Sequence, residues 1–161
     1  MIKKKGGNKL KRIHYIGIII VLLVVVGLFV MSPYSPLNKA SITGKSINLP
    51  SGYTVQNSTG HSLEISNGSN TINIYAHNKS NIKSAIASYK NEHNRTFNIT
   101  QKDIPIDSGE EVIMTTGNKY NDTKTVIYRY WFTKNKRVYD IQTYNKNPET
   151  EKIVKNIISS M

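Results

Sequence analysis

The sequence predicts an α+β domain in which helices sandwich an antiparallel β-sheet, preceded by one N-terminal transmembrane helix. Three observations support this prediction: a long apolar run near the N-terminus, several short segments with alternating apolar residues, and two segments with apolar residues at helical spacing. Sheets and amphipathic helices each have an apolar face, so the two kinds of element bury these faces against one another.

Residues 13–31 form the apolar run, which contains no Lys, Arg, Asp or Glu. A helix needs about 20 such residues to cross a bilayer. The tail before it, residues 1–12, is basic, and cytoplasmic flanks of membrane segments are rich in Lys and Arg. We therefore expect a signal-anchor helix with a cytoplasmic N-terminus and the rest of the chain outside the cell. The residues that indicate this topology are Lys3, Lys4, Lys5, Lys9, Lys11 and Arg12.

Two other interpretations of the run are a cleaved signal peptide and a pilin-like filament segment. A signal peptide has a shorter apolar core of about 7–15 residues and ends at a small-residue cleavage site. Here the run is longer and exits into Met31-Ser32-Pro33, which is a poor match. A pilin-like segment commonly carries an early acidic residue, which this run lacks. A retained anchor is therefore the prediction.

After the anchor, residues 32–46 are predicted to be a linker and residues 47–161 one extracytoplasmic domain, long enough to bury a core. The chain has no Cys, which excludes disulfides, thiolate metal sites and a Cys nucleophile. Six of its 22 basic residues lie in the tail, and the others are dispersed. Nucleic-acid-binding proteins have a clustered basic stripe instead, so no nucleic-acid partner is expected.

The domain is predicted to contain a β-hairpin near its start. Residues 61–65 and 71–76 alternate in polarity, and Asn67-Gly68 between them is typical of a hairpin turn. The two-residue period places His61 on the inner face and His77 on the outer face. The apolar residues of the inner face are Leu63, Ile65, Ile72, Ile74 and Ala76.

A helix over residues 81–93, capped by Ser80, is predicted next. Residues 96–106 and 111–116 then form two further strands. The helix has one apolar stripe, made of Ile82, Ala85, Ile86 and Tyr89.

The clearest strand pair is formed by residues 125–133 and 137–144. A turn centred on Asn135-Lys136 places Phe132 opposite Tyr139. The outer face of this pair mixes apolar and charged side chains: Ile127, Arg129, Trp131, Val138, Asp140, Gln142 and Tyr144. A face open to water would be more polar, so we infer that a helix partly covers it.

The last element is a helix from Pro148 to Ser160. Proline and two glutamates near its start suit a helix N-terminus. Its apolar stripe consists of Ile153, Val154, Ile157 and Ile158.

Three segments of the chain, residues 49–53 (LPSGY), 128–141 and 157–160, resemble parts of PsbP-like domains. Residues 49–53, LPSGY, resemble the LP-x-G-[FY] opening of that family, residues 128–141 resemble its paired-strand unit, and residues 157–160 resemble its I-x-x-S close. The similarity covers about residues 47–161. It implies an antiparallel sheet sandwiched by helices, as in membrane-anchored PsbP-related proteins of prokaryotes. It also implies a non-enzymatic role in binding or stabilising other proteins, with no shared active-site residues.

The candidate interaction surface lies on the outer face of the strand pair, because aromatic and Arg residues are enriched at interface hot spots. Its residues are Trp131, Tyr144, Ile127 and Arg129. The alternative is that the C-terminal helix packs on this face. Six Asn-x-Ser/Thr sequons are candidate N-glycosylation sites: Asn57, Asn67, Asn78, Asn94, Asn98 and Asn121.

The sequence contains neither a Ser nucleophile elbow nor the ligand spacing of a zinc site, so no catalytic residue, cofactor or metal is predicted. We expect a single-pass membrane protein with a non-enzymatic extracytoplasmic domain that binds a protein or an envelope component. The alternatives are a surface domain that binds a small ligand or ion, and a pilin-like filament subunit.

Overall fold

The computed structural model describes residues 18–25, 39–106, 109–122 and 124–161. The chain divides into two compact units, Met1–Asn38 and Lys39–Met161. In the first unit, residues 18–25 form a helix. Within the described ranges, no helix combines the length and the apolar character that a membrane span requires. The rest of the predicted anchor, the basic tail and residues 32–38 of the predicted linker lie outside the described residues, so the anchor stays a prediction.

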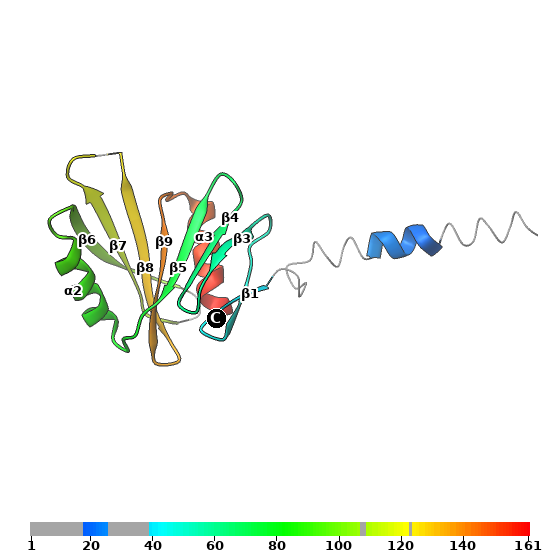
Figure 1. Ribbon diagram of the computed structural model, residues 1–161, viewed down its shortest axis with the longest axis horizontal. Coiled ribbons are helices and arrows are strands. Elements are labelled where there is room, and N and C mark those ends of the chain that lie inside the picture. Colours follow the sequence, from blue (N-terminus) through cyan, green and yellow to red (C-terminus); the bar gives the residue numbers. More distant parts are fainter. Residues whose placement is uncertain (1–17, 26–38, 107–108, 123) are drawn as a thin grey trace, which may run out of the picture. The chain divides into compact units, whose positions relative to one another are not determined.

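The second unit contains a seven-stranded antiparallel sheet and a separate two-stranded hairpin, together with helices α2 (Ile82–His93) and α3 (Pro148–Ser160) (Figure 1). The predicted α+β class is therefore confirmed. The hairpin consists of β1 (Lys39–Ile42) and β2 (Lys45–Asn48). The strands of the sheet are β3 (Thr54–Ser58), β4 (Ser62–Ser66), β5 (Thr71–Ala76), β6 (Phe97–Ile104), β7 (Val112–Lys119), β8 (Val126–Lys134) and β9 (Arg137–Thr143).

The order of strands in the sheet is β3-β4-β5-β9-β8-β7-β6. It consists of two meanders, one running from β3 to β5 and the other from β6 to β9. Strands β5 and β9 join the two meanders at the centre, where Ile74 pairs with Ile141. Helix α2 lies in the connection between the meanders, and α3 follows the second one.

The predicted hairpin is confirmed as β4 and β5, and its inner residues Leu63, Ile65, Ile72 and Ile74 are buried. Gly68 has a φ of +86°, a conformation that glycine adopts without strain. The prediction for His61 is wrong, because this residue is exposed. It lies in the turn before β4, where its backbone N–H donates to the Thr59 hydroxyl across 3.2 Å.

The predicted register of the last two strands is also confirmed. Phe132 pairs with Tyr139, and the two rings are stacked with centroids 5.6 Å apart. Asn135 and Lys136 form the turn, with φ values of 51° and 62°. Two consecutive positive φ values match the twist of the strands on either side, and asparagine tolerates them better than most residues.

The two helices bury their predicted stripes in different cores, at different ends of the sheet (Figure 1). Helix α3 contributes Val154, Ile157 and Ile158 to the larger cluster, here called the main core. Helix α2 covers the other face of the sheet with Ile82, Ala85, Ile86 and Tyr89, over Ile113, Trp131 and Val138; this is the second core. The sheet is thus covered by a helix on each face, as predicted.

Asn81 caps α2, so the prediction that Ser80 is the cap is wrong by one residue. The Asn81 side chain accepts a hydrogen bond from the backbone N–H of Ser84 across 3.0 Å. Asn147 caps α3 in the same way, by accepting from the N–H of Thr150 across 2.7 Å. An N-cap oxygen bonds to the N–H two or three residues ahead; Asn81 is three residues before Ser84, whereas Ser80 is four residues before it.

The prediction that residues 32–46 form a linker is wrong from Lys39 onward. Strands β1 and β2 fold into a hairpin whose Ile42 and Ile47 are at most 1% exposed and belong to the main core. Thr43 and Gly44 make the turn, with φ values of 50° and 75°. The segment looked like a linker because only a few of its residues are apolar, but these few alternate and share one face.

Candidate functional site

Helix α2 covers only part of its face of the sheet, and the remaining strands present polar side chains. The second core includes residues of β7, β8 and β9 but none of β4 or β5. On these two strands the same face carries Glu64, Asn73 and Tyr75, which are all half-buried. Tyr75 lies opposite Asp140 of β9, and Asn73 lies opposite Gln142.

A hydrogen-bonded network centred on Arg129 lies at the border between the part of the sheet that α2 covers and this polar surface. The Asp140 carboxylate accepts a bond from Arg129 Nη1 across 2.9 Å, and His77 Nε2 lies 2.6 Å from its other oxygen. Arg129 Nη2 donates to Gln142 Oε1 across 2.7 Å, and Gln142 Nε2 donates to the Tyr144 hydroxyl across 2.9 Å. These five residues are here called the Arg129 cluster.

Aromatic rings surround the guanidinium of Arg129. Its Cζ atom lies 4.6 Å from the ring centroid of Tyr89, 5.5 Å from that of Tyr75 and 5.9 Å from that of Trp131. Burial raises the pKa of the Tyr89 and Tyr75 hydroxyls, while the positive charge of Arg129 acts in the opposite direction. The ring faces attract the cation and hold its plane in one orientation.

The residues of the cluster differ in exposure: the carboxylate is buried, and the residues around it are accessible to solvent. The Asp140 side chain is 0% exposed, so its buried charge must be compensated by its two neighbours, Arg129 and His77. The side chains of Arg129 and His77 are 17% and 31% exposed. Tyr144, at the end of the chain of bonds, is 55% exposed. The cluster therefore presents a fixed pattern of donors, acceptors and rings to solvent.

The His77–Asp140 pair has the geometry in which a carboxylate orients an imidazole. In nucleophilic catalysis, such an imidazole also contacts a hydroxyl or thiol. Within the described part of the chain, Asp140 is the hydrogen-bond partner of the His77 ring, and the ring packs against Trp131 with centroids 5.3 Å apart. The arrangement suits recognition of a polar partner.

Of the four predicted surface residues, the structure gathers Arg129 and Tyr144 into the cluster. Trp131 is only 1% exposed, so its predicted role as a contact residue is wrong. It lies in the second core, and its Nε1 donates to the hydroxyl of Thr115 across 2.9 Å. Ile127 is half-buried opposite Gly117. A helix does cover this face, as the alternative interpretation predicted. The covering helix is α2, however, and not the C-terminal helix named in that prediction.

Sequence reasoning did not select His77, Asp140 or Gln142 as site residues. The two-residue period had placed Asp140 and Gln142 on the same outer face as Arg129, and His77 on the outer face of a different hairpin. The missing information was the pairing of β5 with β9, which brings His77 next to Asp140. No local pattern indicates that pairing.

The six sequon asparagines are all exposed. Asn67, in the turn before β5, accepts bonds from the backbone N–H groups of Ser69 and Asn70. The others lie on edge strands, turns or the end of α2. Their accessibility fits the predicted glycosylation, which stays a prediction.

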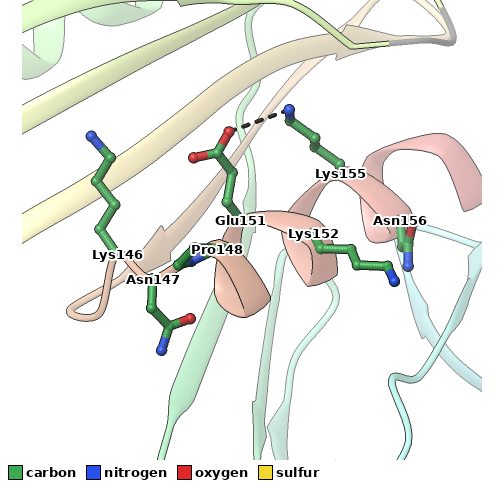
Figure 2. Close-up of a pocket in the computed structure, with 7 residues that line it drawn as sticks. All are labelled: Lys146, Asn147, Pro148, Glu151, Lys152, Lys155 and Asn156. Atoms are coloured by element: carbon green, nitrogen blue, oxygen red, sulfur yellow. Dashed lines mark ion pairs between the residues drawn. The ribbon is translucent and has the colours of Figure 1, made fainter.

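The described part of the surface includes two hollows. The larger, with a volume of about 630 Å³, lies beside the first turns of α3 and is lined by polar and basic side chains (Figure 2). The smaller, of about 480 Å³, lies between α2 and strands β6 and β7. Neither includes a residue of the Arg129 cluster.

Comparison of the chain with protein-family models finds no match, and a search of curated proteins finds none either.

Proposed function

We propose that this chain is a non-enzymatic binding protein, anchored in a membrane by residues 13–31, whose domain of residues 39–161 lies outside the cell. The domain binds a protein or envelope component through the Arg129 cluster and the uncovered surface of β4 and β5. The observation that carries this proposal is the cluster itself, a polar and aromatic surface fixed in place by a buried carboxylate.

The composition of this surface supports binding. Tyr and Arg are the residue types that contribute most to binding energy at protein interfaces. Here Tyr75, Arg129 and Tyr144 are linked through packing and hydrogen bonds, so their side chains lose little conformational freedom when a partner arrives. The uncovered strands extend the surface with Glu64 and Asn73.

The anchoring part of the proposal depends on the N-terminal sequence. Residues 18–25 are helical and their apolar side chains are 55% to 67% exposed, which suits contact with lipid. The preceding tail carries six basic residues and no acidic one. The sheet with a helix on each face agrees with the PsbP-like architecture, and we propose membership of that family on the residues 49–53, 128–141 and 157–160.

A photocrosslinking experiment tests the binding surface. Tyr144 and Tyr120 are 55% and 56% exposed, and only Tyr144 belongs to the cluster. A photoreactive phenylalanine derivative at position 144 should give a discrete crosslinked product in intact cells, and the same derivative at position 120 should not. The product should disappear when Tyr75→Ala is combined with it. Equal products at both positions would exclude the cluster as the binding surface.

Thiol labelling tests the topology, because the natural chain has no Cys and each introduced thiol is unique. In intact cells, a membrane-impermeant maleimide should label Ser69→Cys in the exposed turn of the domain and should leave Gly6→Cys in the basic tail unlabelled. After the membrane is permeabilised, both should react. Labelling of Gly6→Cys alone in intact cells would reverse the proposed orientation.

A further inference from the structure

The main-core face of the sheet has an uncovered part of its own, on strands β6, β7 and β8. Thr100 pairs with Thr116, and Thr116 pairs with Tyr128, so the three hydroxyl-bearing side chains form a row on one face. Lys102 lies on the same face, opposite Met114. Thr100 and Lys102 are exposed, and Thr116 and Tyr128 are half-buried. This part of the face therefore consists mainly of hydrogen-bond donors.

The larger hollow lies beside the first turns of α3. It is lined by Lys146, Lys152, Lys155 and Glu151, with Pro and Asn side chains between them. In Figure 2, Lys146, Glu151 and Lys155 extend to the same side of the α3 backbone. Lys155 Nζ lies 3.2 Å from Glu151 Oε1, so the one carboxylate is paired. Three ammonium groups against one carboxylate leave the hollow with a net positive charge.

Two observations connect the hollow to the sheet. Lys146 Nζ lies 5.7 Å from the centroid of the Tyr128 ring, which belongs to the row of hydroxyl groups. Burial raises the pKa of Tyr130 to about 12, and the nearby charge of Glu151 adds to the increase. Tyr130 is 1% exposed, and its hydroxyl has no hydrogen-bond partner among the described residues. Tyr130 thus has an unused hydroxyl near Glu151, one of the residues that line the hollow.

We propose that this hollow binds a phosphate group, held by the ammonium groups of Lys146 and Lys155. Ammonium donors that extend to the same side of one helix (Figure 2) suit the several acceptor oxygens of a phosphate. The volume of about 630 Å³ is within the range of small-ligand sites. Residues 39–161 contain 16 Lys and Arg against 10 Asp and Glu, a net charge of +6 that attracts anions to the domain.

This site is independent of the proposed binding surface. The Arg129 cluster lies on the α2 face of the sheet, and Tyr128 and Tyr130 point to the opposite face, toward the main core. Substitutions in one should leave the other unchanged. The phosphate group can belong to a soluble phosphate ester or to a lipid headgroup, since both offer the same oxygens.

Calorimetric titration of the full chain in a nonionic maltoside detergent with inorganic phosphate tests the site. Lys146→Gln combined with Lys155→Gln should weaken binding about tenfold or more, because hydrogen bonds to charged groups are the strong ones. Glu151→Gln should strengthen binding, because it removes the one negative charge in the hollow. Lys83→Gln, which removes an exposed charge on α2, is the matched control and should bind as the natural chain does.

The results of this titration distinguish specific binding of phosphate in the hollow from non-specific attraction of anions to a basic domain. Absence of phosphate binding at millimolar concentration, or an equal loss in the Lys83→Gln control, overturns the proposal. A second arm places the chain in nanodiscs with and without phosphatidic acid. If the lipid headgroup is the ligand, phosphatidic acid should weaken the binding of added phosphate in the natural chain but not in the double variant. If the ligand is soluble, the affinity for added phosphate should be the same in both kinds of disc.

Discussion

Arg129 Nη1 lies 2.9 Å from Oδ2 of Asp140, a residue whose side chain is completely buried. The two residues stand diagonally across β8 and β9, since Arg129 is paired with Gln142 and Asp140 with Trp131. A carboxylate at this depth is tolerated only when a cation compensates it. The stability of the domain therefore depends on the same residue that we propose as the centre of its binding surface.

The Arg129→Met variant tests this dependence. Removal of the guanidinium leaves Asp140 with His77 as its remaining partner, so the free energy of unfolding should fall by about 3 kcal/mol. Urea unfolding at neutral pH measures the loss. Arg95→Met is the control, because Arg95 is exposed and its loss should change stability by less than about 0.5 kcal/mol. A similar small effect at position 129 would show that the pair does not stabilise the fold.

Fluorescence of the one Trp in the chain tests the packing of α2. The Trp131 ring packs against the rings of Tyr89 and His77, with centroids 5.5 Å and 5.3 Å away. Its emission should be blue-shifted and resistant to acrylamide in the folded protein, and should shift to the red on unfolding. A red emission that acrylamide quenches readily in the native state would contradict the position of α2.

Alkaline titration tests the environment of Tyr130. Burial raises the pKa of its hydroxyl from 10.0 to about 12, so between these pH values the unfolded chain loses a proton that the folded chain keeps. Stability should therefore fall as pH rises from about 10 to about 12, by on the order of 2 kcal/mol from this group. Tyr130→Phe should remove this part of the loss, and a pH profile identical to that of the natural chain would refute the assignment.

The Tyr130→Phe variant makes a second point at neutral pH. The buried hydroxyl has no hydrogen-bond partner among the described residues, so its removal should leave stability unchanged or raise it by about 1 kcal/mol. A clear loss of stability would mean that the hydroxyl is bonded in solution.

The N-cap of α2 can be identified by two neighbouring substitutions. Asn81→Ala removes the oxygen that accepts from Ser84 and should destabilise the domain by about 1 kcal/mol. Ser80→Ala, one residue earlier, should have little effect. Thermal unfolding of the two variants gives the comparison, and the reverse order of effects would favour the cap that the sequence predicts.

The hairpin of β1 and β2 makes the last test. Ile47 is 0% exposed in the main core, so Ile47→Ala should reduce the free energy of unfolding by about 3 kcal/mol. Lys45→Ala in the same strand serves as the control, with a change below about 0.5 kcal/mol. If both substitutions are silent, residues 39–48 do not belong to the folded core.

Local patterns predicted those parts of the fold that local physics determines. The pairing of Phe132 with Tyr139 follows from a two-residue turn, and the stripe of α2 follows from helical spacing. An apolar stripe shows that a helix is buried but not against which strands, so the helix over Trp131 was assigned wrongly. The Ser80 prediction failed because two adjacent residues both suit an N-cap, and the backbone selects one of them.

The candidate site was predictable only in part, for a related reason. Arg129 and Tyr144 were selected by residue type and by their shared face. Their link to His77 depends on β5 lying beside β9, and these strands are far apart in the sequence. Long-range pairing leaves no periodic trace in either strand, so the role of the buried Asp140 carboxylate in the cluster could not be recognised in advance.

The junction of β5 and β9 has a consequence for the kinetics of folding. Each meander joins strands that are neighbours in the sequence, whereas pairing Ala76 with Tyr139 requires the intervening chain to close into a long loop. Such closure costs entropy before its contacts compensate for it, and it slows folding. His77 donates its backbone N–H to Val138 across 2.8 Å and places its ring on Asp140. We therefore expect each meander to form faster than β5 pairs with β9. The polar residues at this junction stabilise the pairing once it has formed.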